Sequence, residues 1–242
     1  MTSPFDFCPQ PSRSAAGLVP SHRTVLDPLP YRVGPGLAHR AALGMLVLAT
    51  DQTIEHEVRD LTRADGIGVF VARLESSLHV CPENLRAMES RVQAAAALLV
   101  PGVPLDAVAF GCTSGAVFIG EDRVRARINA AHPGVPVTTP MAAARAALAA
   151  LDARRIALVT PYTAIINDHL ADAFEAHGVT VSVLASFLED DDARACRIDG
   201  SSLHDAMIAA GRAAPVDAVF VSCTSLRAAA LVSAAEAALV AR

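Results

Sequence analysis

Two short motifs place a cysteine and two hydroxyl side chains directly after a Val-rich run. The first is "DAVAFGCTS", which ends with Cys112, Thr113 and Ser114. The second is "DAVFVSCTS", which stands 111 positions later and ends with Cys223, Thr224 and Ser225. Thiols can act as acid, base or nucleophile, and hydroxyls can bind the oxygens of a carboxylate. We therefore predict that both cysteines are catalytic and that the four hydroxyls bind substrate.

The chemistry depends on where the two motifs lie in a fold. If the Val-rich runs are parallel strands, both cysteines lie at the carboxyl ends of the strands, where open α/β sheets bind ligands. A following helix N-terminus would lower the pKa of each thiol. With two thiols on opposite faces of one substrate, one could remove a proton while the other delivers one. Alternatively, one thiolate could add to the substrate while the other thiol protonates the opposite face. In the structural alternative, each cysteine is only a small buried residue in a tight turn.

The remainder of the chain alternates strand and helix patterns, which predicts an α/β fold with parallel sheets. The expected strands are 42–50, 68–74, 106–111, 135–139, 155–160, 179–187 and 217–222. The expected helices are 53–64, 82–100, 121–131, 140–152, 163–177, 201–213 and 225–241.

The repeat of the Cys-Thr-Ser motif extends to other segments. At nearly the same offset, "LVLATDQT" (46–53) falls on "IALVTPYT" (156–163). This favours a duplication over a chance likeness between Val-rich strands. We expect a Pro-rich flexible arm (1–40), a first half (41–152) and a second half (153–242). Because the first half continues further past its cysteine than the second does, we also expect the second half to lack a terminal strand and helix.

Composition excludes several classes of function. A net charge of −5 leaves no broad basic surface for nucleic acid, and no apolar run is long enough to span a membrane. The five cysteines form no Cys-x-x-Cys pair and no signal peptide precedes them, so we expect reduced thiols and a cytoplasmic protein. No dinucleotide or phosphate-binding fingerprint indicates a cofactor. A cysteine phosphatase would need Arg six positions after each cysteine, where Phe118 and Ala229 stand.

Other strand ends supply further candidates for binding substrate. Asp51 and Thr53 follow the first strand, although they could instead cap a helix. Tyr162 follows the equivalent strand of the second half and offers a hydroxyl donor, with packing as the alternative role. His56 has no second histidine one turn away, so we predict no metal site. The acidic run "LEDDDAR" (188–194) is interpreted as an exposed helix start.

The motifs "CTSG", "CTSLR", "LATDQTIEHE" and "TPYTAIIND" resemble the aspartate/glutamate racemase superfamily over about residues 40–240. Within it, the chain is most similar to maleate cis–trans isomerase, arylmalonate decarboxylase and the ectoine-utilisation racemase-like proteins. The resemblance implies two pseudo-symmetric flavodoxin-like halves and cofactor-independent chemistry beside a carboxylate. By motif, Cys112 is the nucleophile or first acid/base, and Cys223 is the thiol that delivers the proton. Tyr162 would donate to the substrate.

One departure from this pattern bears on the substrate. Maleate isomerases have Asn after the first strand, where this chain has Asp51, and a carboxylate there would repel a second substrate carboxylate. We therefore expect a substrate with an amine, such as an amino acid or an acylated diaminobutyrate from ectoine breakdown. The leading prediction is a racemase or isomerase of a small carboxylate or amino acid. The alternatives are a maleate isomerase and a non-catalytic carboxylate-binding protein, and a homodimer is a further expectation.

Overall fold

The computed structural model describes residues 24 and 26–240. The chain divides into residues 1–36 and a compact unit that runs from Leu37 to the C-terminus. Most of the predicted arm lies outside the described residues, and the described residues before Ala41 contain no helix or strand. None of the helices in the described part of the chain combines the length and the hydropathy of a membrane span.

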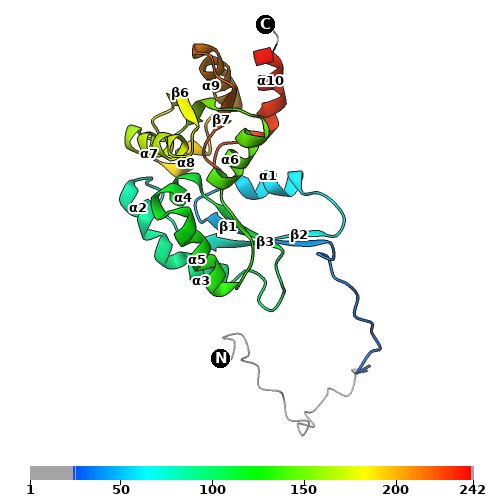
Figure 1. Ribbon diagram of the computed structural model, residues 1–242. Helices are drawn as coiled ribbons and strands as arrows, with labels where there is room; N and C mark the ends of the chain where they lie inside the picture. Colours follow the sequence, from blue (N-terminus) through cyan, green and yellow to red (C-terminus); the bar gives the residue numbers. More distant parts are fainter. Residues whose placement is uncertain (1–23, 25, 241–242) are drawn as a thin grey trace. The chain divides into compact units, whose positions relative to one another are not determined.

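The compact unit contains two parallel sheets (Figure 1). The first sheet has the order β2-β1-β3-β4, and its strands are β1 (Ala41–Leu48), β2 (Ile67–Leu74), β3 (Ala107–Gly111) and β4 (Val137–Thr138). The second has the order β6-β5-β7, and its strands are β5 (Arg155–Thr160), β6 (Thr180–Ser186) and β7 (Ala218–Val221). All pairings are parallel, and corresponding strands take corresponding places. The predicted α/β fold with two pseudo-symmetric parallel sheets is confirmed; in the described residues, the second sheet has no counterpart of β4.

Helices flank both sheets. The first half contains α1 (Ile54–Leu61), α2 (Pro82–Ala87), α3 (Glu89–Ala96), α4 (Thr113–Ile119), α5 (Glu121–Ala131) and α6 (Pro140–Ala150). The second half contains α7 (Ala164–Glu175), α8 (Asp192–Ala195), α9 (Gly200–Ala213), the 3-10 turn η1 (Ala229–Leu231) and α10 (Val232–Val240). The helix ranges expected from the sequence do not include α4 or α8, although residues 188–194 are interpreted there as a helix start. The predicted helix over 225–241 is wrong at its start, because a turn separates β7 from α10.

The repeated Asp-Ala-Val segment has a structural explanation. Asp106 precedes β3 and accepts a 2.7 Å hydrogen bond from the backbone N–H of Ala42 in β1. Asp217 precedes β7 and accepts from the N–H groups of Arg154 and Arg155, at 3.0 and 2.9 Å, at the start of β5. Each aspartate therefore fixes the start of the central strand of its sheet, which in turn sets where the following cysteine lies.

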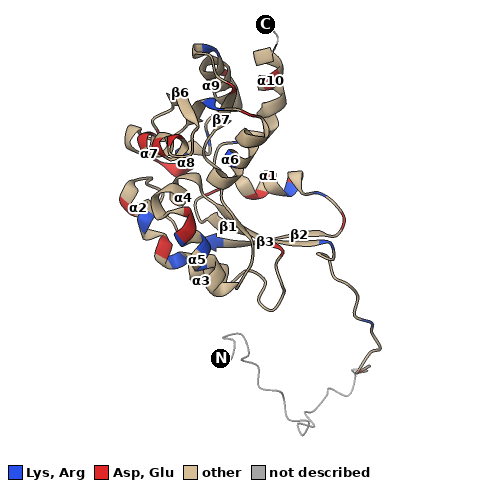
Figure 2. Ribbon diagram, viewed as in Figure 1, with Lys and Arg blue, Asp and Glu red and all other residues tan. Residues whose placement is uncertain are grey.

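The core is apolar on both faces of the central strands. Met45, Leu46 and Val47 are consecutive and fully buried, as expected for a strand covered by helices on both sides. In the second half, Phe174 of α7 meets Phe220 of β7 edge to face, with ring centroids 5.4 Å apart. Charged side chains of both signs are interspersed on α3 and α5 (Figure 2), where Glu89 pairs with Arg123 and Arg127.

Candidate active site

Cys112 occupies the junction between β3 and α4. It is the N-cap residue of α4, and its Sγ accepts a 3.2 Å hydrogen bond from the backbone N–H of Gly115. Gly115 makes this approach possible: a Cβ at that position would lie 2.8 Å from Met88 Cε and 2.9 Å from Cys112 Sγ. The Cys112 thiol can therefore occupy this position only because residue 115 is a glycine.

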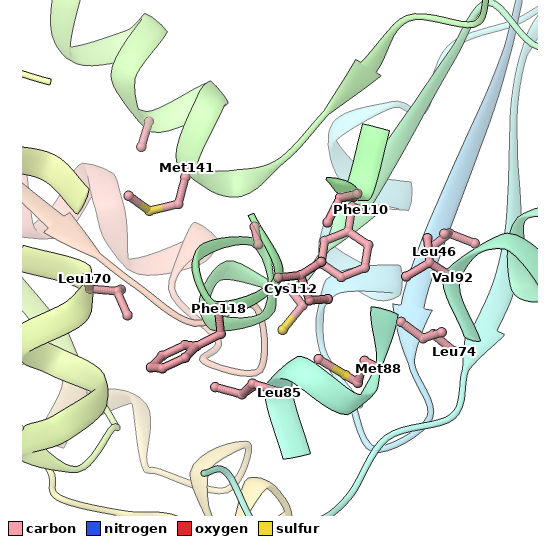
Figure 3. Close-up of a cluster of buried hydrophobic side chains, with 14 of the residues drawn as sticks. Leu46, Leu74, Leu85, Met88, Val92, Phe110, Cys112, Phe118, Met141 and Leu170 are labelled. Carbon is pink, nitrogen blue, oxygen red and sulfur yellow. The ribbon is translucent and has the colours of Figure 1, made fainter. Parts of the chain in front are cut away.

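The surroundings of Cys112 are mostly apolar. It is buried in the hydrophobic cluster that includes Met88, Phe110 and Phe118 (Figure 3). Burial raises the pKa of the Cys112 thiol to about 12, although the hydrogen bonds from Gly115 and Ser114 act in the opposite direction. The expectation of a lowered thiol pKa is therefore wrong for the free protein, because desolvation outweighs the helix N-terminus.

Cys223 lies in a different kind of turn. Its φ is 134°, a conformation that residues with a side chain rarely adopt, and no helix starts at the following residue. Burial and then the charge of Asp192 raise the pKa of the Cys223 thiol to about 11, although the Tyr162 hydroxyl acts in the opposite direction. The two motifs thus place their thiols at corresponding strand ends but in unlike backbone settings.

Tyr162 is fully buried between the two motifs. Burial, followed by the two neighbouring thiols, raises the pKa of its hydroxyl well above the usual value, while Ser114 acts in the opposite direction. Buried polar side chains shape the turn: Thr160 Oγ1 accepts from the Tyr162 N–H at 3.2 Å, and Asn167 Nδ2 donates to the Tyr162 carbonyl at 2.9 Å. The hydroxyl is therefore held as a neutral donor next to both sulfur-bearing turns.

These residues converge on one small cavity. Its lining includes six of the predicted site residues, which are Cys112, Ser114, Tyr162, Cys223, Thr224 and Ser225. It also includes Leu48, Ser76, Ser77, His79, Val80, Asn84, Leu85, Met88 and Asp192. The cavity volume is about 20 Å³, which is room for about one water molecule. Binding of even a small carboxylate therefore requires lining side chains to move.

Three predicted site residues do not line the cavity. Asp51 accepts hydrogen bonds from the N–H groups of Thr53 and Ile54, at 2.7 and 2.9 Å, and a third from the Thr224 hydroxyl at 2.9 Å. The Thr53 hydroxyl donates to the Ser225 carbonyl at 2.9 Å. Thr113 is buried in the first turn of α4. Asp51 and Thr53 therefore fix the position of the turn that follows Cys223.

Asp192 is the site residue that sequence reasoning missed. The sequence pattern favours an exposed acidic run at this position, but Asp192 is only 5% exposed and lines the cavity. Its Oδ1 accepts a 2.9 Å hydrogen bond from Ser225 Oγ, and its Oδ2 accepts from Thr50 Oγ1. The only signal in the sequence is that Asp192, Ala195 and Cys196 would share one face of a short helix, a weak pattern over five residues.

The described residues contain no group of three or more metal-binding side chains, and the four cysteines among them have free thiols. The fifth, Cys8, lies outside the described residues. His56, considered for a metal site from sequence, is exposed and lies 3.4 Å from Asp60 on α1, away from the cavity lining.

A comparison with protein families decides which family contains this site. Residues 68–241, which include both cysteine motifs and Tyr162, match the family described as arylmalonate decarboxylase. The chain belongs to the arylmalonate decarboxylase family. Among curated proteins, the maleate isomerase of Nocardia farcinica is 27% identical over 194 residues, which is 75% of each chain. Members of this family and its relatives are enzymes of the isomerase and decarboxylase type.

Solved structures of family relatives share the fold. The Nocardia farcinica maleate cis–trans isomerase, solved as a mutant with a covalently bound succinylcysteine intermediate, has a TM-score of 0.69 and 24% identity, and the match covers 81% of this chain and 84% of that chain. A double mutant of arylmalonate decarboxylase in its liganded form has a TM-score of 0.70 and 24% identity, with 82% and 84% covered. The maleate isomerase of Pseudomonas putida S16 has a TM-score of 0.72 and 21% identity, and the match covers 82% of this chain and 85% of that chain.

Proposed function

We propose that this family member is a cofactor-independent racemase or isomerase that acts on a small carboxylate or amino acid through Cys112 and Cys223. The observation that carries the proposal is that both thiols and the Tyr162 hydroxyl line one cavity. Three groups that can move or donate protons then surround one substrate carbon. Among amino acids, the sequence resemblance favours an acylated diaminobutyrate from ectoine breakdown.

The mechanism uses the two thiols on opposite sides of the substrate. One sulfur, as thiolate, takes the proton from the carbon next to the carboxylate, and the electron pair of the C–H bond moves into the carboxylate as an enolate. The other thiol returns a proton to the opposite face and becomes the thiolate. The Ser114 and Tyr162 hydroxyls donate to the carboxylate oxygens while negative charge accumulates there.

The thiol pKa values impose a condition on this mechanism. Because burial raises both pKa values, to about 12 and about 11, both thiols are neutral in the free protein at pH 7. Formation of the reactive thiolate therefore belongs to the substrate complex, in which donors and charges of the substrate change the surroundings of the sulfur atoms. We expect slow alkylation of Cys112 and Cys223 by iodoacetamide in the free protein below pH 9.

A maleate cis–trans isomerase is the second candidate function. The Nocardia farcinica relative, whose structure contains a succinylcysteine intermediate, supports it. In that reaction the Cys112 sulfur, as thiolate, would add to one carbon of the double bond, and the π electrons would move into the neighbouring carboxylate as an enolate. The central bond, now single, would rotate, and return of the electrons with loss of the sulfur would restore the double bond. The small volume of the cavity supports a third candidate function, in which the protein binds a carboxylate without converting it.

Proton exchange separates these functions. Candidate acids are incubated with the protein in D2O, and loss of the Cα–H signal is followed by NMR, while maleate conversion is followed in parallel. We expect Cα–H exchange that falls by on the order of 10²- to 10⁴-fold in Cys112→Ala and in Cys223→Ala. Cys81→Ala is the matched control, because Cys81 does not line the cavity. Maleate conversion without Cα–H exchange would favour the second function, and neither reaction would favour the third.

A further inference from the structure

Asp192 is a buried carboxylate without a cationic partner in the described part of the chain. Its acidic neighbours have partners: Glu189 lies 2.6 Å from Arg194, and Asp190 lies 3.3 Å from His79. Asp192 instead accepts from two hydroxyls, those of Ser225 and Thr50. Buried carboxylates are usually paired with a cation, because taking an isolated charge out of water is costly.

The charge of Asp192 acts on the cavity. After burial, it is the next cause that raises the pKa of Cys223, and it also contributes to the raised pKa values of Cys112 and Asp51, both due mainly to burial. The lining contains no Arg, and its histidine, His79, is the partner of Asp190. Among the described residues, Asp192 is therefore the one acidic side chain in the cavity lining, and no arginine lines the cavity beside it.

The hydrogen-bonding capacity of Asp192 fits a donor from the substrate. Each carboxylate oxygen can accept two hydrogen bonds, and each oxygen of Asp192 accepts one from the protein. A protonated amine supplies three donors and a full positive charge, so it can use the remaining capacity and offset the charge. A second carboxylate of the substrate would face Asp192 without a donor.

Asp51 is less suited to this role. Its carboxylate accepts three hydrogen bonds from the protein, and it does not line the cavity. The amine expected from the sequence at Asp51 is better placed at Asp192, which accepts a hydrogen bond from Ser225 and belongs to the cavity wall.

We propose that Asp192 determines the substrate class by binding a protonated amino group, so that the substrate is an amino acid or another ammonium-bearing carboxylate. This proposal rests on the cavity being the substrate site, as proposed above. It also links binding to catalysis: an ammonium next to Asp192 offsets the negative charge that opposes ionisation of the Cys223 thiol.

The test measures binding, so that it stands apart from turnover. Isothermal titration calorimetry gives Kd for four acids with one carbon skeleton: butyrate, 2-aminobutyrate, 4-aminobutyrate and 2,4-diaminobutyrate. We expect at least one ammonium-bearing acid to bind about tenfold or more tightly than butyrate, because a charged donor strengthens a hydrogen bond to a carboxylate. In Asp192→Asn this preference should fall to within about twofold.

Matched variants decide the assignment. Asp168→Asn makes the same change of charge at an exposed position of α7 and should keep the wild-type preference. If Asp192→Asn does not fold, Asp192→Ser gives the same comparison with a smaller polar side chain. The proposal is overturned if the wild type shows no ammonium preference, or if the Asp192 variants retain it. If the wild type prefers ammonium-bearing acids but catalyses no Cα–H exchange, only the proposed catalytic function is contradicted.

Discussion

The Thr224 hydroxyl donates a 2.9 Å hydrogen bond to Asp51 Oδ2, which joins the turn after β7 to the turn after β1. A second bond runs the other way, from the Thr53 hydroxyl to the Ser225 carbonyl. The two halves of the duplicated fold are thus connected at the point where Cys223 faces the cavity. The position of one cysteine depends on residues that are about 170 positions away in the sequence.

We predict that Thr224→Val destabilises the protein by about 1–2 kcal/mol, because it leaves a buried carboxylate oxygen of Asp51 without its donor. It should also raise the pKa of Asp51 further, since the hydrogen bond from Thr224 lowers that pKa. Urea denaturation at pH 7 measures the free energy of unfolding. Thr180→Val, at an exposed position of β6, makes the same substitution and should change stability little. Equal effects of the two variants would show that the connection contributes nothing.

Gly115→Ala should reduce activity much more than stability. The new Cβ would lie within 3 Å of Cys112 Sγ and Met88 Cε. Displacement of the thiol by up to 1 Å lowers kcat by about 10²-fold, while overpacking costs about 1–3 kcal/mol. Gly200→Ala is the control, because a Cβ there meets only Leu231 at 3.9 Å. Full activity of Gly115→Ala on the substrate found by Cα–H exchange would show that the position of Cys112 is not critical.

Tyr162→Phe should remove a donor without removing the ring that packs in the core. We expect kcat to fall by about 10²-fold, the effect of losing one preorganised donor. Alkylation of Cys223 should become slower, because the Tyr162 hydroxyl lowers the pKa of that thiol. Tyr31→Phe is the matched control, since Tyr31 is 85% exposed in the segment before β1. An unchanged kcat would assign Tyr162 to packing alone.

Asp217 predicts a dependence of stability on pH. Arg155 and the N–H groups of Arg154 and Arg155 hold the pKa of this carboxyl well below its usual range. A carboxyl whose pKa is lower in the folded protein than in the unfolded chain stabilises the fold at pH values above the unfolded pKa. This stabilisation is lost as the pH falls toward the folded pKa. Asp217→Asn should therefore destabilise the protein at pH 7, with a difference from wild type that shrinks below about pH 4. Thermal unfolding from pH 3 to 8 tests this, with Asp152→Asn as an exposed control.

The strands and the paired cysteines could be predicted because their signals are local. Val-rich runs ending in Cys-Thr-Ser indicate buried strands, and all seven expected strands are present. The role of Asp106 and Asp217 could not be predicted. An aspartate before a strand looks the same in the sequence whether it accepts hydrogen bonds from the neighbouring strand or is exposed to solvent. Helix α4 was missed because "TSGAVFI" contains Gly and β-branched residues, which local propensity disfavours in helices.

The sequence by itself determined the duplicated parallel α/β fold and the place of the two thiols at strand ends, because hydrophobic periodicity and strand direction follow from local order. Only the tertiary structure decided that Asp192, and not Asp51, lines the cavity. It also decided that both thiols have raised pKa values, since desolvation depends on neighbours brought from distant segments. The burial of a site and the charges around it depend on all the segments that pack against it in the folded protein, so no single stretch of the sequence determines them.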